Sequence, residues 1–370
     1  MKTMVSNMTH VCLGDVAREI KQKVPAGQEL PTVGLEHLDP GEVELAHWDE
    51  GVETTFTKAF SKGQVLFGRR RAYLRKAAVA PFDGICSGDI TVIAPKDNVS
   101  PRLLPFIIQN DALFEHAVTN SAGSLSPRVK WQSLSQFEFE LPSIAKQEEL
   151  ADILWTAQET RSHYRQLLTA CDDVVKSQFV EMFGEPAENP KGWETSSLTS
   201  LGSCKNGMNF KSKESGIELP CLGVGDFKDR SVINDVSEMG RINLDDEPAE
   251  GYFLKDGDIV FVRSNGNKEL VGRCLAVYPH GEKAVFSGFC IRLRVESDKV
   301  RIPYLIWALK QPSMRQQMFG RGANVQNLNQ KLMAKVDVPI PPLAEQDRFL
   351  ALVSIVDKSK FKLGTCGGML

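Results

Sequence analysis

The sequence lacks several features that would define its class directly. No run reaches the roughly 18 consecutive apolar residues of a membrane span, and the first residues, MKTMVSNMTHVCLGDV, contain no apolar signal core. None of the eight cysteines forms a CxxC pair, and the six histidines are scattered without metal-ligand spacing. We therefore expect a cytoplasmic protein with reduced, mostly buried thiols, no metal site and no membrane partner.

Recognisable catalytic motifs are also lacking. There is no GxxxxGK[ST] phosphate loop, and no Ser-His-Asp or Cys-His constellation can be nominated. Asp15, Glu19 and Lys21 loosely resemble nuclease spacing, but we interpret them as the polar face of a short helix at 14–23. We predict no catalytic residue. A catalytic site can also form from residues that are far apart in the sequence, so a self-contained nuclease or methyltransferase stays an alternative.

What the sequence does contain is an internal repeat of about 200 residues. LPSIAKQEEL at 141–150 recurs as IPPLAEQDRFL at 340–350, and CSGDITVI at 86–93 recurs as FSGFCIRL at 286–293. The chain has 370 residues, which is long enough for two domains. We predict an α+β protein with two β-rich domains in tandem, at 1–143 and 190–341.

Both copies contain short apolar runs bounded by Gly, Pro or Asp, which is typical of β-strands. Each copy also has an amphipathic segment that begins at a proline and predicts a helix. The expected strands are 64–67, 77–80, 89–93, 258–262, 274–278 and 289–293, and the expected helices are 101–118 and 302–319.

Two longer helices are expected after the domains, within segments 144–189 and 342–370. Residues 146–183 contain no Gly or Pro, and their apolar residues follow a 4–3 rhythm that includes Leu150, Leu154 and Val175. Residues 345–363 repeat the start of that pattern. We predict that the two helices pack as an antiparallel coiled coil; the alternative is that the first helix docks on its own domain.

The stretch FGRRRAYLRK at 67–76 has five positive charges in a chain of net charge −3. We interpret it as a turn at Gly68 followed by a strand over 73–80. Arginine in such a turn can hold phosphates or guanine edges. The alternative is a solvated turn that pairs with the acidic segment 42–53.

The second copy favours the DNA-binding interpretation of this stretch over the solvated turn. Seven residues separate Phe67 from Arg75, whereas eleven separate the matched Phe261 from Arg273, and they include polar types that read DNA. Two domains with the same framework strands and different loops are suited to bind two different DNA sequences.

These motifs resemble the specificity (S) subunit of type I restriction–modification enzymes. The paired junctions, the central SQFVEMFGEPAENPKGWE, and GSLSPRVKW carry the resemblance, which covers essentially the whole chain. It implies a subunit without a catalytic centre or a cofactor of its own, in which each domain reads half of a split double-stranded DNA target and the helices set the spacer. It also implies two modification subunits, which carry S-adenosylmethionine and methylate adenine, and restriction subunits that use ATP and Mg²⁺.

The candidate DNA-binding residues come from the turns of both copies. In the first domain they are Arg69, Arg70, Arg71, Tyr73, Arg75, Lys76, Ser124, Arg128 and Lys130; in the second they are Arg263, Asn265, Asn267, Lys268, Arg273, Arg321, Asn324 and Gln326. A third hypothesis is a coiled-coil scaffold between proteins that does not bind DNA.

Overall fold

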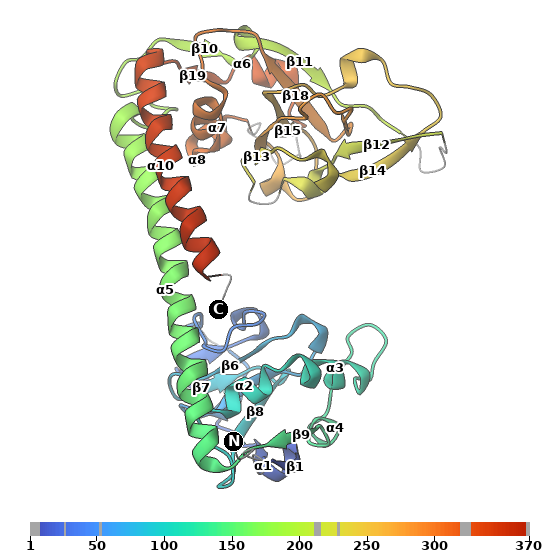
Figure 1. Cartoon of the computed structure of the whole chain (residues 1–370), viewed down its shortest axis with the longest axis vertical. Coiled ribbons are helices and arrows are strands. Elements are labelled where there is room, and N and C mark those ends of the chain that lie inside the picture. Colours follow the sequence, from blue (N-terminus) through green and yellow to red (C-terminus); the bar gives the residue numbers. More distant parts are fainter. Residues whose placement is uncertain are drawn as a thin grey trace, which may run out of the picture. The chain divides into compact units, whose positions relative to one another are not determined.

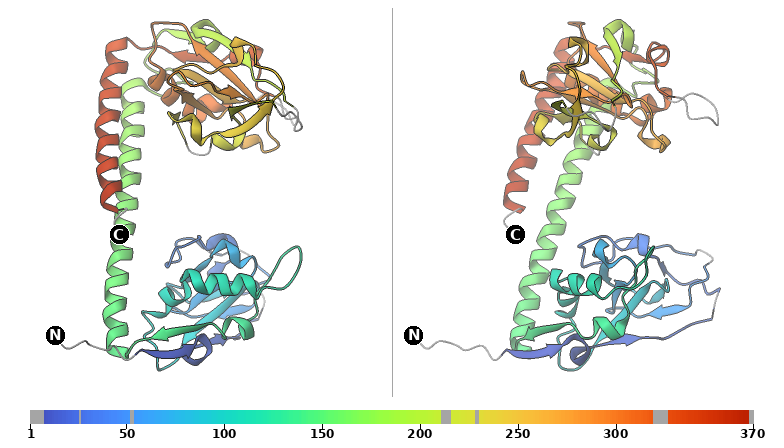
Figure 2. Two further views of the ribbon diagram at one scale, coloured as in Figure 1. Left: turned by 45° about the vertical axis from the view of Figure 1, so that its right-hand side comes forward. Right: turned by 90° about the vertical axis from the view of Figure 1, so that its right-hand side faces the viewer.

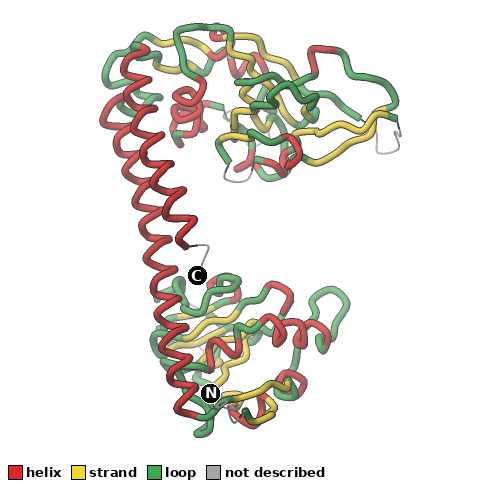
Figure 3. The backbone as a smooth tube through the Cα atoms, in the orientation of Figure 1, coloured by secondary structure: helices red, strands yellow, loops and turns green. Residues whose placement is uncertain are grey.

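The computed structural model describes residues 8–25, 27–51, 54–210, 216–227, 230–318 and 327–367. The chain divides into two compact units inside one helix, with His163 ending the first unit and Tyr164 beginning the second. Figure 1 labels the elements of each unit, and Figure 3 shows that both combine strands with short helices. None of the described helices is long and apolar enough to cross a membrane.

The first unit is built on a four-stranded antiparallel sheet in the order β2-β8-β5-β6, a three-stranded sheet in the order β3-β7-β4, and the pair β1-β9. Its strands are β1 (Thr9–Cys12), β2 (Ala17–Ile20), β3 (Thr32–Val33), β4 (Lys58–Phe60), β5 (Val65–Gly68), β6 (Ala77–Val79), β7 (Gly84–Cys86), β8 (Ile90–Pro95) and β9 (Glu138–Leu141). Its shorter helices are α1 (Leu13–Val16), η1 (Leu35–His37), η2 (Ala72–Leu74), α2 (Leu104–Ile108), α3 (Asp111–Thr119) and α4 (Trp131–Leu134).

The four-stranded sheet is buried on both faces. Along β5, Val65 and Phe67 belong to the core cluster that also contains residues of α2 and α3, whereas Leu66 belongs to a second cluster with β3 and β7. Successive side chains of a strand point to opposite faces, so the run VLF serves two cores. This explains why the framework strands are continuously apolar rather than alternating.

Two predicted helices of the first unit were wrong. The segment 101–118 forms two helices, because the Asn110 side chain accepts a hydrogen bond from the Ala112 N–H (2.8 Å) and starts α3 afresh. The helix expected at 14–23 stops at Val16, and the following residues form β2, which pairs with β8. Backbone pairing to the sheet outweighs helix propensity there.

The second unit repeats this plan. Its sheets have the orders β11-β18-β15-β16-β13, β14-β12-β17 and β10-β19. Its strands are β10 (Thr195–Ser197), β11 (Gly202–Asn206), β12 (Ile217–Leu222), β13 (Val232–Ile233), β14 (Gly240–Leu244), β15 (Asp258–Val262), β16 (Cys274–Val277), β17 (Val285–Phe286), β18 (Cys290–Val295) and β19 (Asp337–Pro339). Its shorter helices are α6 (Leu198–Leu201), η3 (Val224–Asp226), η4 (Val236–Glu238), η5 (Glu250–Tyr252), η6 (Lys268–Leu270), α7 (Ile302–Lys310), α8 (Pro312–Gln317) and α9 (Gln330–Met333).

The repeated junction motif has the same structural role in both units. The buried Gln147 accepts a hydrogen bond from Ser100 N (2.8 Å) and donates to Pro142 O (2.9 Å). The buried Gln346 accepts from Arg301 N (2.8 Å) and donates to Pro341 O (2.7 Å). Each glutamine therefore fixes the start of a long helix to its own domain. The predicted tandem repeat and the six predicted strands are confirmed. The single helix predicted at 302–319 was wrong, because the extended backbone of Gln311 before Pro312 ends α7 and starts α8.

The long helices are α5 (Ile144–Phe183) and α10 (Leu343–Gly367). Asp172 bonds to Lys360, whereas the rings of Phe179 and Phe349 lie 5.3 Å apart, so contacts earlier in α5 meet residues later in α10. Within the second unit the two helices therefore run antiparallel, as Figure 2 also shows.

The helix pair departs from the predicted apolar pattern near the end of α5. Continued three residues beyond Val175, the 4–3 rhythm predicts Gln178 at the contact face. Phe179 is instead the fully buried residue, and it packs with Phe183 and Tyr304. The end of α5 thus joins the core of the second unit. The alternative of docking on the first domain holds for the start of α5, where Trp155 packs against Phe106 with ring centroids 5.1 Å apart.

Candidate nucleic-acid interface

The structure brings together the two predicted motifs of the first domain, although they are more than 50 residues apart in sequence. Arg71 N donates to Pro127 O (2.8 Å), and Val129 N donates to Arg69 O (3.0 Å). Arg70 and Arg128 form a backbone bridge between these bonds. Residues 69–71, which we call the arginine turn, and the segment 126–129 therefore form one surface at the end of β5.

An aspartate that the sequence reasoning missed holds this surface together. The Arg128 side chain donates twice to Asp89, from Nε to Oδ1 (2.6 Å) and from Nη2 to Oδ2 (3.1 Å). Arg70 Nη1 lies 3.5 Å from Asp89 Oδ2, and Arg70 Nη2 donates to Ser126 Oγ (3.1 Å). We call Arg70, Asp89 and Arg128 the arginine clamp.

The clamp also sets the charge state of Asp89. The hydrogen bonds from Arg128 hold the pKa of the Asp89 carboxyl below its usual range, against the opposing effect of burial, and the charges of Arg70 and Arg69 act in the same direction. Asp89 is therefore ionised at neutral pH and neutralises part of the positive charge of the turn. Arg70 and Arg128 are positioned by this contact before any ligand arrives.

The strand predicted over 73–80 was wrong in its first half. Residues 72–74 form the 3-10 helix η2, and Arg71 and Arg75 on either side of it have positive φ angles of 53°. β6 begins only at Ala77. An alternating pattern of polar and apolar residues cannot reveal such left-handed residues, because only glycine marks them reliably.

This geometry separates the predicted residues into exposed and engaged side chains. Tyr73 is 55% exposed on η2, and Arg71 is also exposed. Arg75 pairs with Asp111 (2.6 Å), and Lys76 Nζ donates to Leu35 O (2.7 Å). The turn therefore offers Arg71 and Tyr73 to a ligand more directly than Arg75 or Lys76.

The loop before Arg128 projects from the same surface. Ala122 and Arg128 exchange two backbone hydrogen bonds (3.0 and 2.9 Å), which close a loop with Ser124 and Leu125 at its tip. Ser124 and Lys130 are exposed, and Leu125 is 91% exposed.

The second domain has the same backbone frame. Arg263 N donates to Phe289 O (2.8 Å) as Arg69 N donates to Asp89 O (3.0 Å), and Leu328 N donates to Arg263 O (2.9 Å) as Val129 N donates to Arg69 O. Arg69 and Arg263 are thus structurally equivalent. The buried Nε atoms of both arginines have no hydrogen-bond partner in the described part of the chain.

The strand register corrects one predicted match between the domains. Phe67 pairs with Ala77 and Phe261 with Cys274, so that Arg273 corresponds to Lys76 and not to Arg75. The connections are nine residues (68–76) and twelve residues (262–273) long, and the second domain keeps the longer loop.

The predicted residues of the second loop, 262–273, lie in two separate places. Asn265 Oδ1 accepts a bond from Asn267 N (2.8 Å), which folds the loop into a turn before η6, and Asn265 faces a groove beside Phe289. Arg273 lies in a different pocket. The side chain of Lys268 lies outside the described residues, as do Arg321, Asn324 and Gln326 altogether.

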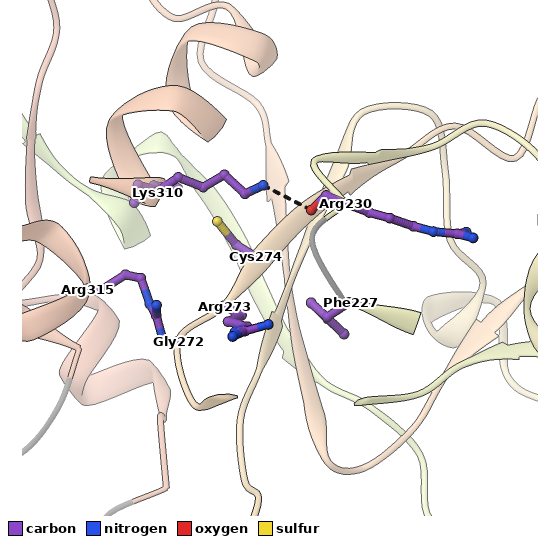
Figure 4. Close-up of a pocket in the computed structure, with 8 residues that line it drawn as sticks. Phe227, Arg230, Gly272, Arg273, Cys274, Lys310 and Arg315 are labelled. Carbon is purple, nitrogen blue, oxygen red and sulfur yellow. Dashed lines mark hydrogen bonds between the residues drawn. The ribbon is translucent and has the colours of Figure 1, made fainter. Parts of the chain in front are cut away.

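The pocket around Arg273 is strongly basic. Arg230, Arg273, Lys310 and Arg315 line a cavity of about 230 Å³ at the start of β16, as Figure 4 shows. Burial and the neighbouring charge of Arg273 lower the pKa of Arg315 from its ordinary value. In Figure 4 the Arg230 side chain extends away from this cavity, where it pairs with Glu238, so Arg273, Lys310 and Arg315 supply the like charges that favour an anion. The sequence reasoning missed Arg315, which lies on α8, far along the chain from the turn it joins.

Three buried cysteines have raised thiol pKa values. Burial raises the pKa of Cys86, Cys221 and Cys274 to about 12, so these thiols stay protonated. Among the described residues, no three His, Cys, Asp or Glu side chains gather in a way that would hold a metal ion.

Comparison with known proteins places this geometry in a family. The model described as type I restriction modification DNA specificity domain matches residues 6–166 and again 190–365. The StySPI type I restriction enzyme specificity subunit of Salmonella potsdam is 24% identical over 78% of this chain and 64% of its own length. The EcoKI specificity subunit of Escherichia coli strain K12 is 24% identical over 64% of this chain and 54% of its own length. The chain thus spans less than two thirds of the length of these relatives.

Solved structures share the fold. The S subunit of a type I restriction-modification system from M. genitalium matches with a TM-score of 0.56 at 14% identity, covering 100% of this chain and 94% of the other. A chain from a structure on the complex assembly and conformational transition of the type I R-M system matches with a TM-score of 0.56 at 18% identity, covering 100% and 95%.

Proposed function

Because the chain belongs to the family of type I restriction-modification DNA specificity domains, we propose that it recognises DNA and gives a type I restriction–modification complex its sequence specificity. Each of its two domains reads one half of a bipartite double-stranded target. α5 and α10 fix the spacing between the halves and dock the modification subunits.

One observation carries the proposal: the two domains hold different side chains on the same backbone frame. Arg69 and Arg263 occupy equivalent positions, but Arg70, Asp89 and Arg128 around the first are matched by Ser264, Phe289 and Asn327 around the second. Two surfaces with one frame and different side chains are suited to read two different DNA sequences, because guanidinium, amide and apolar side chains contact different base edges.

Two surfaces are suited to different parts of DNA binding, the basic pocket to affinity and the arginine clamp to sequence specificity. The basic pocket with Arg273 and Arg315 suits a backbone phosphate, because it gathers cations without offering a unique pattern of donors and acceptors. The arginine clamp suits base recognition, because Asp89 fixes the orientation of Arg70 and Arg128.

Chemistry belongs to the partners in this proposal. Two modification subunits carry S-adenosylmethionine and methylate adenine, and restriction subunits use ATP and Mg²⁺. In this proposal the chain contributes no catalytic group, binds none of these cofactors and acts in the cytoplasm with its partners.

The test is to map methylated adenines in the host genome, with and without this gene. We expect a two-part motif with a fixed gap to disappear on deletion. The purified chain, incubated alone with DNA, Mg²⁺ and S-adenosylmethionine, should neither cleave nor methylate. Activity without partners would support a self-contained enzyme instead, and the lack of salt-dependent DNA binding in the presence of modification subunits would support a scaffold.

A further inference from the structure

An aromatic side chain of the second domain is exposed although its backbone is rigidly held. Phe289 is 62% exposed in the turn between β17 and β18. Its carbonyl accepts bonds from Arg263 N (2.8 Å) and Ser264 N (3.1 Å), and the preceding Gly288 N donates to Met208 O (2.7 Å). Exposing a large apolar ring to water costs free energy. An exposed ring on a backbone that is held by these bonds is suited to contact a partner.

Phe289 borders a groove with a mostly apolar lining. The groove has a volume of about 420 Å³, and its apolar and polar walls include Phe210, Val224, Ile242, Phe289, Ser264 and Asn265. The bond from Asn267 N to Asn265 Oδ1 orients the Asn265 amide within this loop. An aromatic ring and an oriented amide therefore lie at one rim, beside the arginine at 263.

The equivalent position of the first domain carries Asp89. The two residues share their backbone environment, since Asp89 N donates to Ser87 Oγ (3.2 Å) and Phe289 N donates to Ser287 Oγ (3.3 Å). In the first domain the position organises two arginines. In the second it presents an apolar ring, so the two domains offer different chemistry to DNA at the same place.

We propose that Phe289 contacts the C5-methyl group of a thymine in the second half-site and is a specificity-determining residue. The inference rests on the proposed DNA-recognition function. The thymine methyl is the one apolar group that a base pair presents in the major groove, and phenylalanine is among the side chains that contact it. Asn265, at the same rim, has the amide that reads an adenine edge. The positive charge of Arg263 favours approach of the phosphate backbone to this surface.

The test uses the full chain assembled with its modification subunits and duplexes that contain the target motif. Each thymine of the second half-site is replaced in turn by deoxyuridine, which lacks only the methyl group. Dissociation constants are measured by fluorescence anisotropy at one salt concentration. Burial of one methyl-sized group changes an equilibrium constant by about fourfold, so we expect one substitution to weaken wild-type binding by about that factor.

The variant Phe289→Ala should bind the thymine and deoxyuridine duplexes equally at that position, whereas Phe289→Leu should keep most of the difference. Val232→Ala is the matched control, because Val232 is an exposed apolar residue of the same domain that does not line the groove. It should keep the fourfold difference, and deoxyuridine in the first half-site should affect all variants alike.

Two results would overturn the inference while leaving the proposed function intact. One is specific binding in which Phe289→Ala keeps the wild-type sensitivity to deoxyuridine. The other is a second half-site without thymine, or without any position that is sensitive to the methyl group. Failure of the assembled complex to bind any DNA sequence specifically would overturn both.

Discussion

The arginine clamp has two expected roles, which are to stabilise the first domain and to orient Arg70 and Arg128 for recognition of the first half-site. Replacing Asp89 by asparagine tests both. Asparagine keeps the size of the side chain but removes its charge. The lost contact is a two-point pair with Arg128 at 2.6 and 3.1 Å and a weaker one with Arg70 at 3.5 Å. The Asp89 side chain is 20% exposed and that of Arg128 is 41% exposed. Solvent therefore weakens the pair relative to a buried one.

The magnitude lies between the value of a surface ion pair and that of a buried charged hydrogen bond. We expect Asp89→Asn to lower the free energy of unfolding of the first domain by about 1.5 kcal/mol. For a domain of this size that corresponds to a fall in melting temperature of about 3–6 °C, which differential scanning calorimetry would measure.

The dependence on pH has a defined sign. The pKa of Asp89 is lower in the folded state than its ordinary value, so its stabilisation is complete above the unfolded-state pKa of about 4 and is lost as the pH falls through the folded-state pKa. The difference between wild type and Asp89→Asn should be constant above about pH 5 and shrink below about pH 4.

The same variant should change DNA binding in two opposite directions. Losing one negative charge should strengthen binding to unrelated DNA, whereas losing the fixed orientation of Arg70 and Arg128 should reduce discrimination at the first half-site. Anisotropy measurements with matched and mismatched duplexes separate these effects. Unchanged discrimination at the first half-site, together with the expected loss of stability, would refute the role of the clamp in recognition.

Four further substitutions test separate parts of the interface and the start of α5. Arg70→Ala should weaken binding at the first half-site alone, by about 1–3 kcal/mol; equal weakening at both halves would contradict the domain assignment. Arg71→Ala should weaken binding to all sequences alike in a filter-binding series. Arg315→Ala should lower the slope of log K against log salt by about 0.9 without altering the preferred sequence; an unchanged slope would remove the basic pocket from the interface. Gln147→Ala should lower the free energy of unfolding by about 2–3 kcal/mol by leaving buried backbone groups unpaired, whereas Gln166→Ala on the exposed face of the same helix should have little effect in urea titrations.

The sequence was sufficient to predict the repeat because the same residues perform the same tasks in both copies. Gln147 and Gln346 bond to equivalent backbone groups at the two junctions, and the continuously apolar strands reflect a sheet that is buried on both faces. Framework features of this kind depend on local sequence and on burial, both of which leave a pattern along the chain.

The candidate interface was only partly predictable for three physical reasons. The left-handed residues Arg71 and Arg75 carry no glycine signal. The match of Arg273 depended on strand register, which pairing fixes and spacing does not. The contributions of Asp89 and Arg315 arise from contacts with residues 39 to 46 positions away, so only the folded chain brings them to the turns.

The equivalence of the two frames limits how recognition can change. Arg69 matches Arg263 and Val129 matches Leu328, so the positions of Arg70 and Arg128 hold Ser264 and Asn327 in the second domain. An aspartate in place of Phe289 would therefore lose the apolar contact without meeting two arginines to hold. The clamp is a unit of three residues from three separate segments, and exchanging one kind of recognition for the other requires changing all three together while the strands beneath them stay as they are.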